Sequence, residues 1–318
     1  MRIVFLGSPE EVIAPLDLLL KSKGVGFELV GVVSQPAKPQ GRGRVLEDPE
    51  VAKFAKANGI PTLQPLKASD PEFLEQFKEL EPDVAVTAAY GQILTDAFLA
   101  IPKRGTINLH PSLLPKYRGA TPVQSAIAAG ESTTGVTVLF TVKKLDAGNI
   151  ILQKTFSIGA TERSCHLMPR LFRESGPMLI EALEILKNNE FVGTPQNEAK
   201  ITHCRKIDKT DGNIDWEHEA EEIYNHFRAY DPWPGSYTFF GDRRIGISDM
   251  VYNPDAITSQ DPGQFIFDKK NHCLVVGTGS GSLHIKHLKP AGSGLTNAAA
   301  FWNGLKDRSH PVFTSDGA

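Results

Sequence analysis

One stretch of the sequence indicates both the fold and the chemistry: Thr106-Ile-Asn-Leu-His-Pro-Ser-Leu-Leu-Pro-Lys-Tyr-Arg-Gly119. Its first four residues alternate in the manner of a β-strand, and Pro111 and Pro115 then hold the chain in a rigid loop. Because Asn108 and His110 are two residues apart, their side chains point to the same side of the strand. We expect them at the C-terminal end of that strand, where open α/β sheets build their sites.

An amide donor beside an imidazole can stabilise a developing oxyanion, so Asn108 and His110 are candidate catalytic residues. The same spacing also fits an asparagine that caps a turn and a histidine buried in the core. Asp146, in Leu145-Asp-Ala-Gly-Asn149, follows the next expected strand and would lie on the same rim of the sheet. A carboxylate there can orient a histidine and stabilise its protonated form. A turn residue of a hairpin is an equally good interpretation of Asp146.

The chain up to about residue 200 alternates between strand-like and helix-like segments. The expected strands are 2–6, 29–34, 83–89, 106–109, 135–142 and 150–156. The expected helices start near Pro9 and Thr121 and otherwise cover 49–58, 70–80 and 163–187. Strands separated by helices indicate βαβ units, so we predict an α/β fold with a doubly wound, mostly parallel sheet.

The pattern changes after about residue 200. One helix is expected at 217–229, and short strand-like runs separated by turn signals follow it. These runs are 236–240, 244–252, 263–267, 273–277 and 282–288. Many short strands with Gly-rich turns indicate a small antiparallel barrel. We therefore predict two domains, 1–204 and 205–318.

The composition excludes several classes of protein. The chain has 318 residues, of which 41% are hydrophobic and 22% charged, which is typical of a globular protein. A net charge of −3 argues against a globally basic nucleic-acid binder. No apolar run approaches the roughly 20 residues of a membrane span, and no secretory signal is evident. The three cysteines form no CxxC pair, so we expect neither a zinc site nor a disulfide framework, and a cytoplasmic location.

Two further segments are candidate binding elements. Tyr90-Gly-Gln-Ile-Leu94 follows an expected strand, where Gly91, Ile93 and Leu94 could wall a flat heteroaromatic ligand. A turn with buried aliphatic side chains explains it equally well. The segment Gln35–Arg44 carries Lys38, Arg42 and Arg44 without an acid, as a loop that enters a phosphate or nucleic-acid groove does. A solvated basic loop is the common alternative.

Two glycine-containing segments do not fit nucleotide motifs. Gly7-Ser-Pro-Glu10 is not a GxGxxG fingerprint, and Gly277-Thr-Gly-Ser-Gly281 lacks the GK[ST] ending of a phosphate loop. The second segment fits the turn of a hairpin better. An enzyme that uses nicotinamide or ATP is therefore disfavoured.

Asn108-x-His110, the loop Ser112-Leu-Leu-Pro115 and Asp146 together resemble the 10-formyltetrahydrofolate-dependent formyltransferases. A wider set of motifs, from residue 3 to about 292, is similar to the members of that family that act on methionyl-tRNA. These motifs are 5–9, 35–43, 88–91, 108–120, 122–124, 135–138, 145–148, 214–216, 231–234 and 289–292. Lys143-Lys144 and Cys165-His-Leu-Met-Pro169 depart from the family pattern and leave the local geometry there open.

The resemblance implies a Rossmann-like catalytic domain over 1–204 and a C-terminal OB-like, tRNA-binding domain over 205–318. It implies that Asn108, His110 and Asp146 are catalytic and that no metal takes part. It assigns the folate to two groups of residues: Tyr90, Gly91, Gln92, Ile93 and Leu94, and Ser112, Leu113, Leu114 and Pro115. The tRNA would meet Lys38, Arg42 and Arg44.

The implied reaction moves a formyl group from 10-formyltetrahydrofolate, a cosubstrate, to the α-amino group of initiator methionyl-tRNA. No tightly bound cofactor and no membrane are expected, and we expect a monomer. Three other functions stay open from the sequence: a hydrolase of the same donor, a sugar-nucleotide formyltransferase, and an inactive RNA-binding module. Asn108 and the Gly-Arg-Gly loop argue against the hydrolase. The same loop and Trp233-Pro234 argue against the sugar-nucleotide enzyme, and the intact set of Asn108, His110 and Asp146 argues against the inactive module.

Overall fold

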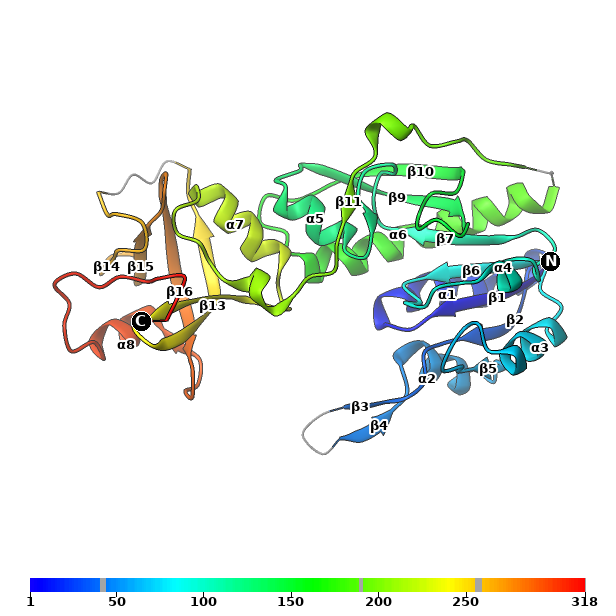
Figure 1. Ribbon diagram of the computed structural model, residues 1–318, viewed down its shortest axis with the longest axis horizontal. Helices are drawn as coiled ribbons and strands as arrows, with labels where there is room; N and C mark the ends of the chain where they lie inside the picture. Colours follow the sequence, from blue (N-terminus) through cyan, green and yellow to red (C-terminus); the bar gives the residue numbers. More distant parts are fainter. Residues whose placement is uncertain (41–43, 189–190, 255–258, 318) are drawn as a thin grey trace. The chain divides into compact units, whose positions relative to one another are not determined.

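The computed structural model describes residues 1–40, 44–188, 191–254 and 259–317 (Figure 1). The chain forms two compact units. The first unit comprises 1–122, 133–157 and 167–204, and the second comprises 123–132, 158–166 and 205–318.

The first unit is built on a sheet of seven strands in the order β10-β9-β7-β6-β1-β2-β5. The strands are β1 (Arg2–Gly7), β2 (Glu28–Val33), β5 (Thr62–Leu63), β6 (Val84–Ala88), β7 (Thr106–His110), β9 (Thr133–Phe140) and β10 (Ile150–Ser157). The first five pair in parallel, whereas β9 and β10 run antiparallel. The predicted doubly wound, mostly parallel sheet is therefore confirmed.

Helices connect these strands, mostly where the sequence predicts them. They are α1 (Ile13–Lys21), α2 (Glu50–Ala57), α3 (Pro71–Glu79), α4 (Asp96–Leu99), α5 (Pro122–Ala128) and α6 (Ser164–Asn188). Asp70 caps α3 by accepting from the Glu72 N–H at 3.0 Å, and Pro71 occupies the first helical position, which needs no N–H donor. No helix among the described residues is long and apolar enough to cross a membrane.

The segment 35–47 differs from the sequence prediction of a simple basic loop. Short strands β3 (Lys38–Gln40) and β4 (Val45–Glu47) pair antiparallel and form a hairpin, which extends away from α2 in Figure 1. The prediction of a loop was wrong because two three-residue strands are too short to produce a recognisable alternation. Val45 and Leu46 are exposed, so this hairpin presents apolar as well as charged side chains to solvent.

The second unit is built on a curved antiparallel sheet that runs β12-β13-β16-β15-β14, with β17 beside β16. Its elements are α7 (Ala220–Ala229), β12 (Ser236–Phe240), β13 (Arg243–Tyr252), β14 (Phe265–Asp268), β15 (Cys273–Gly277), β16 (Ser282–Pro290), β17 (Thr296–Asn297) and α8 (Ala298–Asn303). The turn 278–281 joins β15 to β16, as predicted. Helix α8 was not predicted.

The C-terminal segment closes this sheet into a small barrel. Thr314 pairs with Phe239 at one edge, and Val312 pairs with Gln264 at the other. Between them, Phe313 is 2% exposed and its ring stacks on Phe265 with centroids 4.2 Å apart. The predicted small antiparallel barrel is therefore present, and its closure depends on residues near the end of the chain.

We expect Phe313→Ala to destabilise the full chain by about 3–5 kcal/mol, because it leaves a cavity in the barrel core and removes the anchor of the closing segment. Denaturant unfolding followed by tryptophan fluorescence measures the loss. The matched control is Val312→Ala, since Val312 is 39% exposed. Equal stability of the two variants would show that the barrel does not depend on this ring.

Candidate active site

The three candidate catalytic residues come together at the C-terminal end of β7. Asn108 and His110 lie on β7, and Asp146 lies in the connection between β9 and β10. The Asn108 Nδ2 donates to Asp146 Oδ1 at 3.4 Å, and His110 Nδ1 lies 3.7 Å from Asp146 Oδ2. Asp146 lies 38 positions from Asn108 and 36 from His110 in the sequence, yet its single carboxylate faces both side chains.

The orientation of the His110 ring is fixed by the loop that follows it. His110 Nε2 lies 3.0 Å from the Tyr117 carbonyl oxygen. Because a carbonyl oxygen only accepts hydrogen bonds, Nε2 is the donor there. Nδ1 is then the ring nitrogen that faces Asp146. His110 is 4% exposed, so its ring is held in a buried position with both nitrogens assigned to partners.

The Asn108 amide is oriented by β6. The Thr87 hydroxyl donates to Asn108 Oδ1 at 2.9 Å, so the amide nitrogen is turned towards Asp146. An amide has two N–H donors, and one of them remains for a bound substrate. Thr87 was not among the predicted site residues, although its place at the end of the preceding strand could have indicated it.

Asp146 sits in a strained turn held by several bonds. Its φ of 49° lies in the left-handed region, which is uncommon for residues other than glycine. The Gly119 N–H donates to Asp146 Oδ2 at 2.9 Å, and Gly148 leaves no room for a side chain, since a Cβ there would lie 1.8 Å from the Phe140 carbonyl oxygen. Asp146 therefore lies in a turn, as one of the two sequence interpretations predicts, and its carboxylate also faces His110, while its catalytic role stays a prediction.

The segment Tyr90–Leu94 follows β6, and its residues differ in burial and in the contacts that they make. Tyr90 and Leu94 are buried, whereas Ile93 is 86% exposed. Gln92 is anchored, since its side chain accepts from the Ala68 N–H at 2.7 Å. Gly91 has a φ of 80°, which a glycine adopts without strain.

A hollow of about 430 Å³ brings part of this segment together with the basic hairpin. Its walls include Gln35, Lys38, Gly91, Gln92 and Ile93. The Lys38 amine is bonded to the Gln35 side chain, which in turn donates to the Tyr90 carbonyl at 2.9 Å. Predicted folate residues and a predicted tRNA residue therefore line the same hollow.

The loop Ser112–Pro115 is held against β9. Ser112 is fully buried and donates to the Lys116 carbonyl at 2.8 Å, and Leu114 is 3% exposed. Thr137 ties the loop to the sheet by donating to the Ser112 carbonyl at 2.7 Å. The hydrogen bonds of Ser112 and Thr137 therefore fix the shape of this loop. The role of Leu113 and Pro115 towards a ligand stays a prediction.

Of the three predicted tRNA residues, two are described. Lys38 begins β3, and Arg44 is exposed with a φ of 48° at the start of β4. Arg42 lies outside the described residues. The prediction that these cations meet tRNA stays a prediction.

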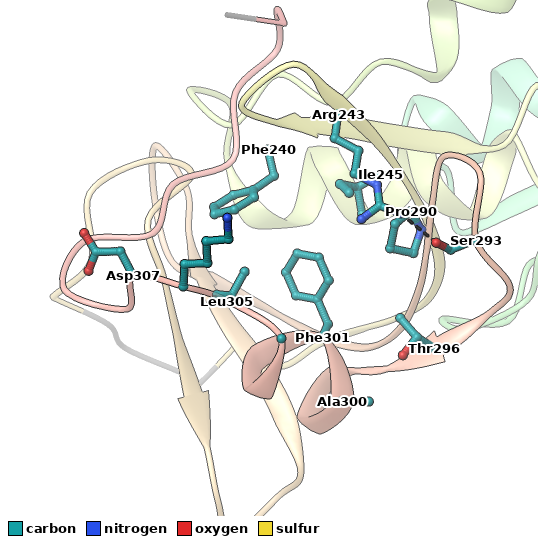
Figure 2. Close-up of a pocket in the computed structure, with 12 residues that line it drawn as sticks. Phe240, Arg243, Ile245, Pro290, Ser293, Thr296, Ala300, Phe301, Leu305 and Asp307 are labelled. Atoms are coloured by element: carbon teal, nitrogen blue, oxygen red, sulfur yellow. Dashed lines mark hydrogen bonds between the residues drawn. The ribbon is translucent and has the colours of Figure 1, made fainter.

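A second hollow lies in the barrel unit and contains none of the predicted site residues. It measures about 580 Å³, and Figure 2 shows the rings of Phe240 and Phe301 turned into it, with Arg243 bonded to Ser293 at its rim. Its walls are mostly apolar. The candidate catalytic residues therefore belong to the first unit, on β7 and in the connection between β9 and β10, and none of them lines this hollow.

The arrangement contains no activated thiol. Burial raises the pKa of the Cys165 thiol to about 11, and its hydrogen bond to Asp231 acts in the same direction. A nucleophilic cysteine needs the thiolate at neutral pH. No group of three or more His, Cys, Asp or Glu side chains within the described ranges could hold a metal ion. The site thus offers an amide, an imidazole and a carboxylate but no nucleophile. Such a set suits the direct attack of one substrate on the acyl carbon of another, with hydrogen-bond donors of the protein stabilising the oxyanion.

Comparisons with known proteins agree with this chemistry. A family model described as formyl transferase matches residues 1–183, and one described as formyl transferase, C-terminal domain, matches residues 206–306. The chain is 41% identical to the methionyl-tRNA formyltransferase of Chloroflexus aggregans, over 96% of this chain and 97% of that protein. It is 38% identical to the enzyme of the same name from Marinobacter nauticus, over 96% and 97%.

Solved structures share the fold at lower identity. HypX from Aquifex aeolicus, in complex with tetrahydrofolic acid, is 18% identical with a TM-score of 0.65, over 98% of this chain and 50% of that chain. An N-formyltransferase from Helicobacter canadensis, in complex with folinic acid and dTDP-3-aminofucose, is 17% identical with a TM-score of 0.65, over 89% and 98%. These likenesses concern the fold alone.

The Tyr90 hydroxyl yields a prediction about pH. Burial raises the pKa of Tyr90 above its ordinary value of 10.0, and the hydroxyl has no hydrogen-bond partner in the part of the chain that the structure describes. Above pH 10 the unfolded chain releases this proton and the folded chain retains it, so stability falls as pH rises. We expect Tyr90→Phe to raise the free energy of unfolding by roughly 1 kcal/mol at neutral pH.

The difference in the free energy of unfolding between Tyr90→Phe and the parent protein should grow between about pH 10 and pH 11. Only the parent protein has a Tyr90 hydroxyl whose titration lowers its stability in that range. Guanidinium unfolding at several pH values measures both effects, with Tyr237→Phe as the control on a partly exposed ring. A constant difference across that range would contradict the burial argument.

Proposed function

The chain belongs to the methionyl-tRNA formyltransferase family, and we propose that it transfers the formyl group of 10-formyltetrahydrofolate to the α-amino group of initiator methionyl-tRNA. The observation that carries the proposal is the convergence of Asn108 and His110 on the Asp146 carboxylate at the edge of the sheet. The two relatives named above, which cover nearly the whole chain, support methionyl-tRNA as the acceptor.

The reaction is acyl transfer without a covalent enzyme intermediate. The free α-amine, whose reference pKa is near ~8, attacks the formyl carbon, and a tetrahedral intermediate forms. Its oxyanion accepts a hydrogen bond from the free Asn108 N–H, and the His110 ring lies beside it, held by the Tyr117 carbonyl and by Asp146. The carbon–nitrogen bond to the folate then breaks, and the proton lost by the amine passes to the leaving folate nitrogen.

Asp146 orients the Asn108 amide and the His110 ring and can hold the water that carries the proton. Its carboxylate faces His110 Nδ1 at 3.7 Å, a separation that leaves the two groups within reach of one bridging water. The Gly119 N–H keeps the same carboxylate in place. The site thus combines oriented donors with a fixed negative charge.

The folate binds as a cosubstrate and leaves after each turnover, with no tightly bound cofactor. Its pteridine lies against Tyr90–Leu94 and the Asp146 turn, and Ser112–Pro115 shapes the wall from below. Exposed Ile93 and the adjoining hollow leave room for the rest of the molecule.

The acceptor tRNA is held by two elements. Lys38 and Arg44 on the hairpin, together with Arg42, contact the acceptor stem, where a mixed basic and apolar surface suits phosphates and base edges. The domain 205–318 offers a second surface, on which Arg244 lies over the Tyr237 ring with its guanidinium carbon 3.6 Å from the centroid. Such cation–aromatic faces bind single-stranded or looped nucleic acid well. The enzyme acts as a cytoplasmic monomer.

A sugar-nucleotide acceptor is the other candidate, because sugar N-formyltransferases share the fold. Their identity to this chain is 17%, whereas relatives named for methionyl-tRNA reach 41% over nearly the whole chain. Incubation of the protein with labelled formyl donor and either methionyl-tRNA, an amino-sugar nucleotide or water tests the proposal. Label in the sugar product or in free formate, and none in the aminoacyl-tRNA, would refute it.

Asn108→Ala, His110→Ala and Asp146→Ala should each lower kcat by roughly 10²- to 10³-fold, the usual loss when one oxyanion donor or its support is removed. Initial-rate measurements with saturating substrates test this, and thermal unfolding confirms that each variant is folded. The control is His218→Ala, on an exposed ring in the second unit. Near-normal turnover by His110→Ala would contradict the mechanism.

Arg42→Ala should lower kcat/KM for methionyl-tRNA strongly while leaving the dissociation constant of a folate analogue unchanged, because the cation contacts only the tRNA. The sequence predicts that Arg42 lies in an exposed loop, and a substitution at such a position should leave stability unaffected. The control removes a similar charge elsewhere: Lys21→Ala breaks only a surface pair with Asp17. If affinity for the folate analogue falls in parallel, or neither quantity changes, Arg42 does not recognise the tRNA.

A further inference from the structure

The segment that follows α6 holds the Asp146 turn from outside the sheet. Gln196 Nε2 donates to the carbonyl oxygens of Asp146 and Gly148, both at 2.8 Å. Figure 1 shows this segment passing β10 before it reaches β11 (His203–Cys204). Thr194 and Ile150 bond to each other through both backbone groups at 2.8 Å, which fixes the path of the segment beside the turn.

The Gln196 amide is itself oriented by a buried arginine. Its Oε1 accepts from Arg118 Nε at 3.0 Å and from Arg118 Nη2 at 2.7 Å, so the amide nitrogen can only point towards the turn. Arg118 is 2% exposed, and its Nη1 has no partner among the described residues. Burial of a cation against a neutral amide costs free energy, and an arrangement with that cost is typical of functional sites.

The strand that carries Arg118 restrains the catalytic groups on both sides of it. In β8 (Arg118–Gly119), the Gly119 N–H holds the Asp146 carboxylate, and the preceding Tyr117 carbonyl holds the His110 ring. β8 pairs in parallel with β11, and a Cβ on Gly119 would lie 2.1 Å from the Cys204 carbonyl oxygen. The segment 194–204 and β8 therefore form one frame around the site.

The Asp146 turn needs such a frame. A non-glycine residue at a φ of 49° is disfavoured and persists only where surrounding bonds determine it. Gln196 bonds to the backbone of the turn, whereas Gly119 bonds to its carboxylate. Without the hydrogen bonds from Gln196 to the backbone of the turn, the Asp146 carboxylate could move away from Asn108 and His110.

We propose that Gln196 is a positioning residue, which sets the Asp146 carboxylate against His110 and Asn108 through the backbone of the turn. This inference deepens the proposed function and rests on it. Gln196 lies between the segments 1–183 and 206–306 that the two family models match, so neither model assigns it. Arg118 orients Gln196 and supports the same role.

Two variants separate positioning from mere stability. Gln196→Glu keeps an acceptor for Arg118 and replaces the donor to Asp146 and Gly148 with a repelling oxygen. Gln196→Ala removes both. Both should lower kcat, by on the order of 10²-fold, with KM for methionyl-tRNA unchanged, because a misplacement of about 1 Å has that effect. Asn197→Ala is the matched control, since that side chain only caps the Ala199 N–H.

The pH profile of kcat and the NMR signals of the His110 ring complete the test. A smaller folded fraction scales the profile without changing its shape, whereas a displaced carboxylate changes the shape and shifts the ring signals. We expect both changes in Gln196→Glu and neither in Asn197→Ala. Wild-type rates, an unchanged profile shape or unmoved ring signals in Gln196→Glu would overturn the positioning role.

The two proposals fail in different ways. If the parent protein does not formylate methionyl-tRNA, the proposed function is wrong, and the His110 ring signals still decide whether Gln196 positions Asp146. If the parent is active and the Gln196 variants are indistinguishable from Asn197→Ala, only the positioning role is wrong.

Discussion

The geometry of the candidate site depends on the carboxylate of Asp146. It faces the Asn108 amide and the His110 ring, and it is held by the Gly119 N–H. A carboxylate so enclosed keeps its negative charge in place only while the donors around it stay fixed. The neighbouring segments are arranged to fix them: Thr87 turns the Asn108 amide, and the Tyr117 carbonyl turns the His110 ring.

The topology of the sheet accounts for part of this arrangement. Strands β6 and β7 run parallel, so the polar residues at their C-terminal ends lie at one edge. Strand β9 pairs antiparallel with β7, and its last residue, Phe140, lies opposite Ile107 near the start of β7, so strand direction alone does not bring Asp146 to that edge. The connection between β9 and β10 carries Asp146 back to Asn108 and His110, where the Gly119 N–H holds its carboxylate.

The second unit is stabilised separately. Its core is a cluster of aromatic and aliphatic side chains, in which Phe313 joins Phe265 and Trp216 from near the end of the chain. Pairing of residues 312 and 314 with the two edge strands removes free edges that could otherwise pair with other chains. A surface that carries Arg244 over Tyr237 can thus be presented on a closed and stable support.

The sequence by itself determined the features that depend on neighbouring residues, namely most strands and helices and the Asp70 cap. It also determined that Asn108 and His110 point to the same side of their strand, because side chains in a strand repeat with a period of two residues. With the resemblance, it also determined the family. Only the tertiary structure decided that Asp146 meets both side chains, that Gln196 and Arg118, 78 positions apart, brace it, and that Phe313 closes the barrel. Local periodicity reports which way a side chain points relative to its own strand or helix. It carries no information on which distant segment packs against it, because that choice follows from the packing of the whole chain.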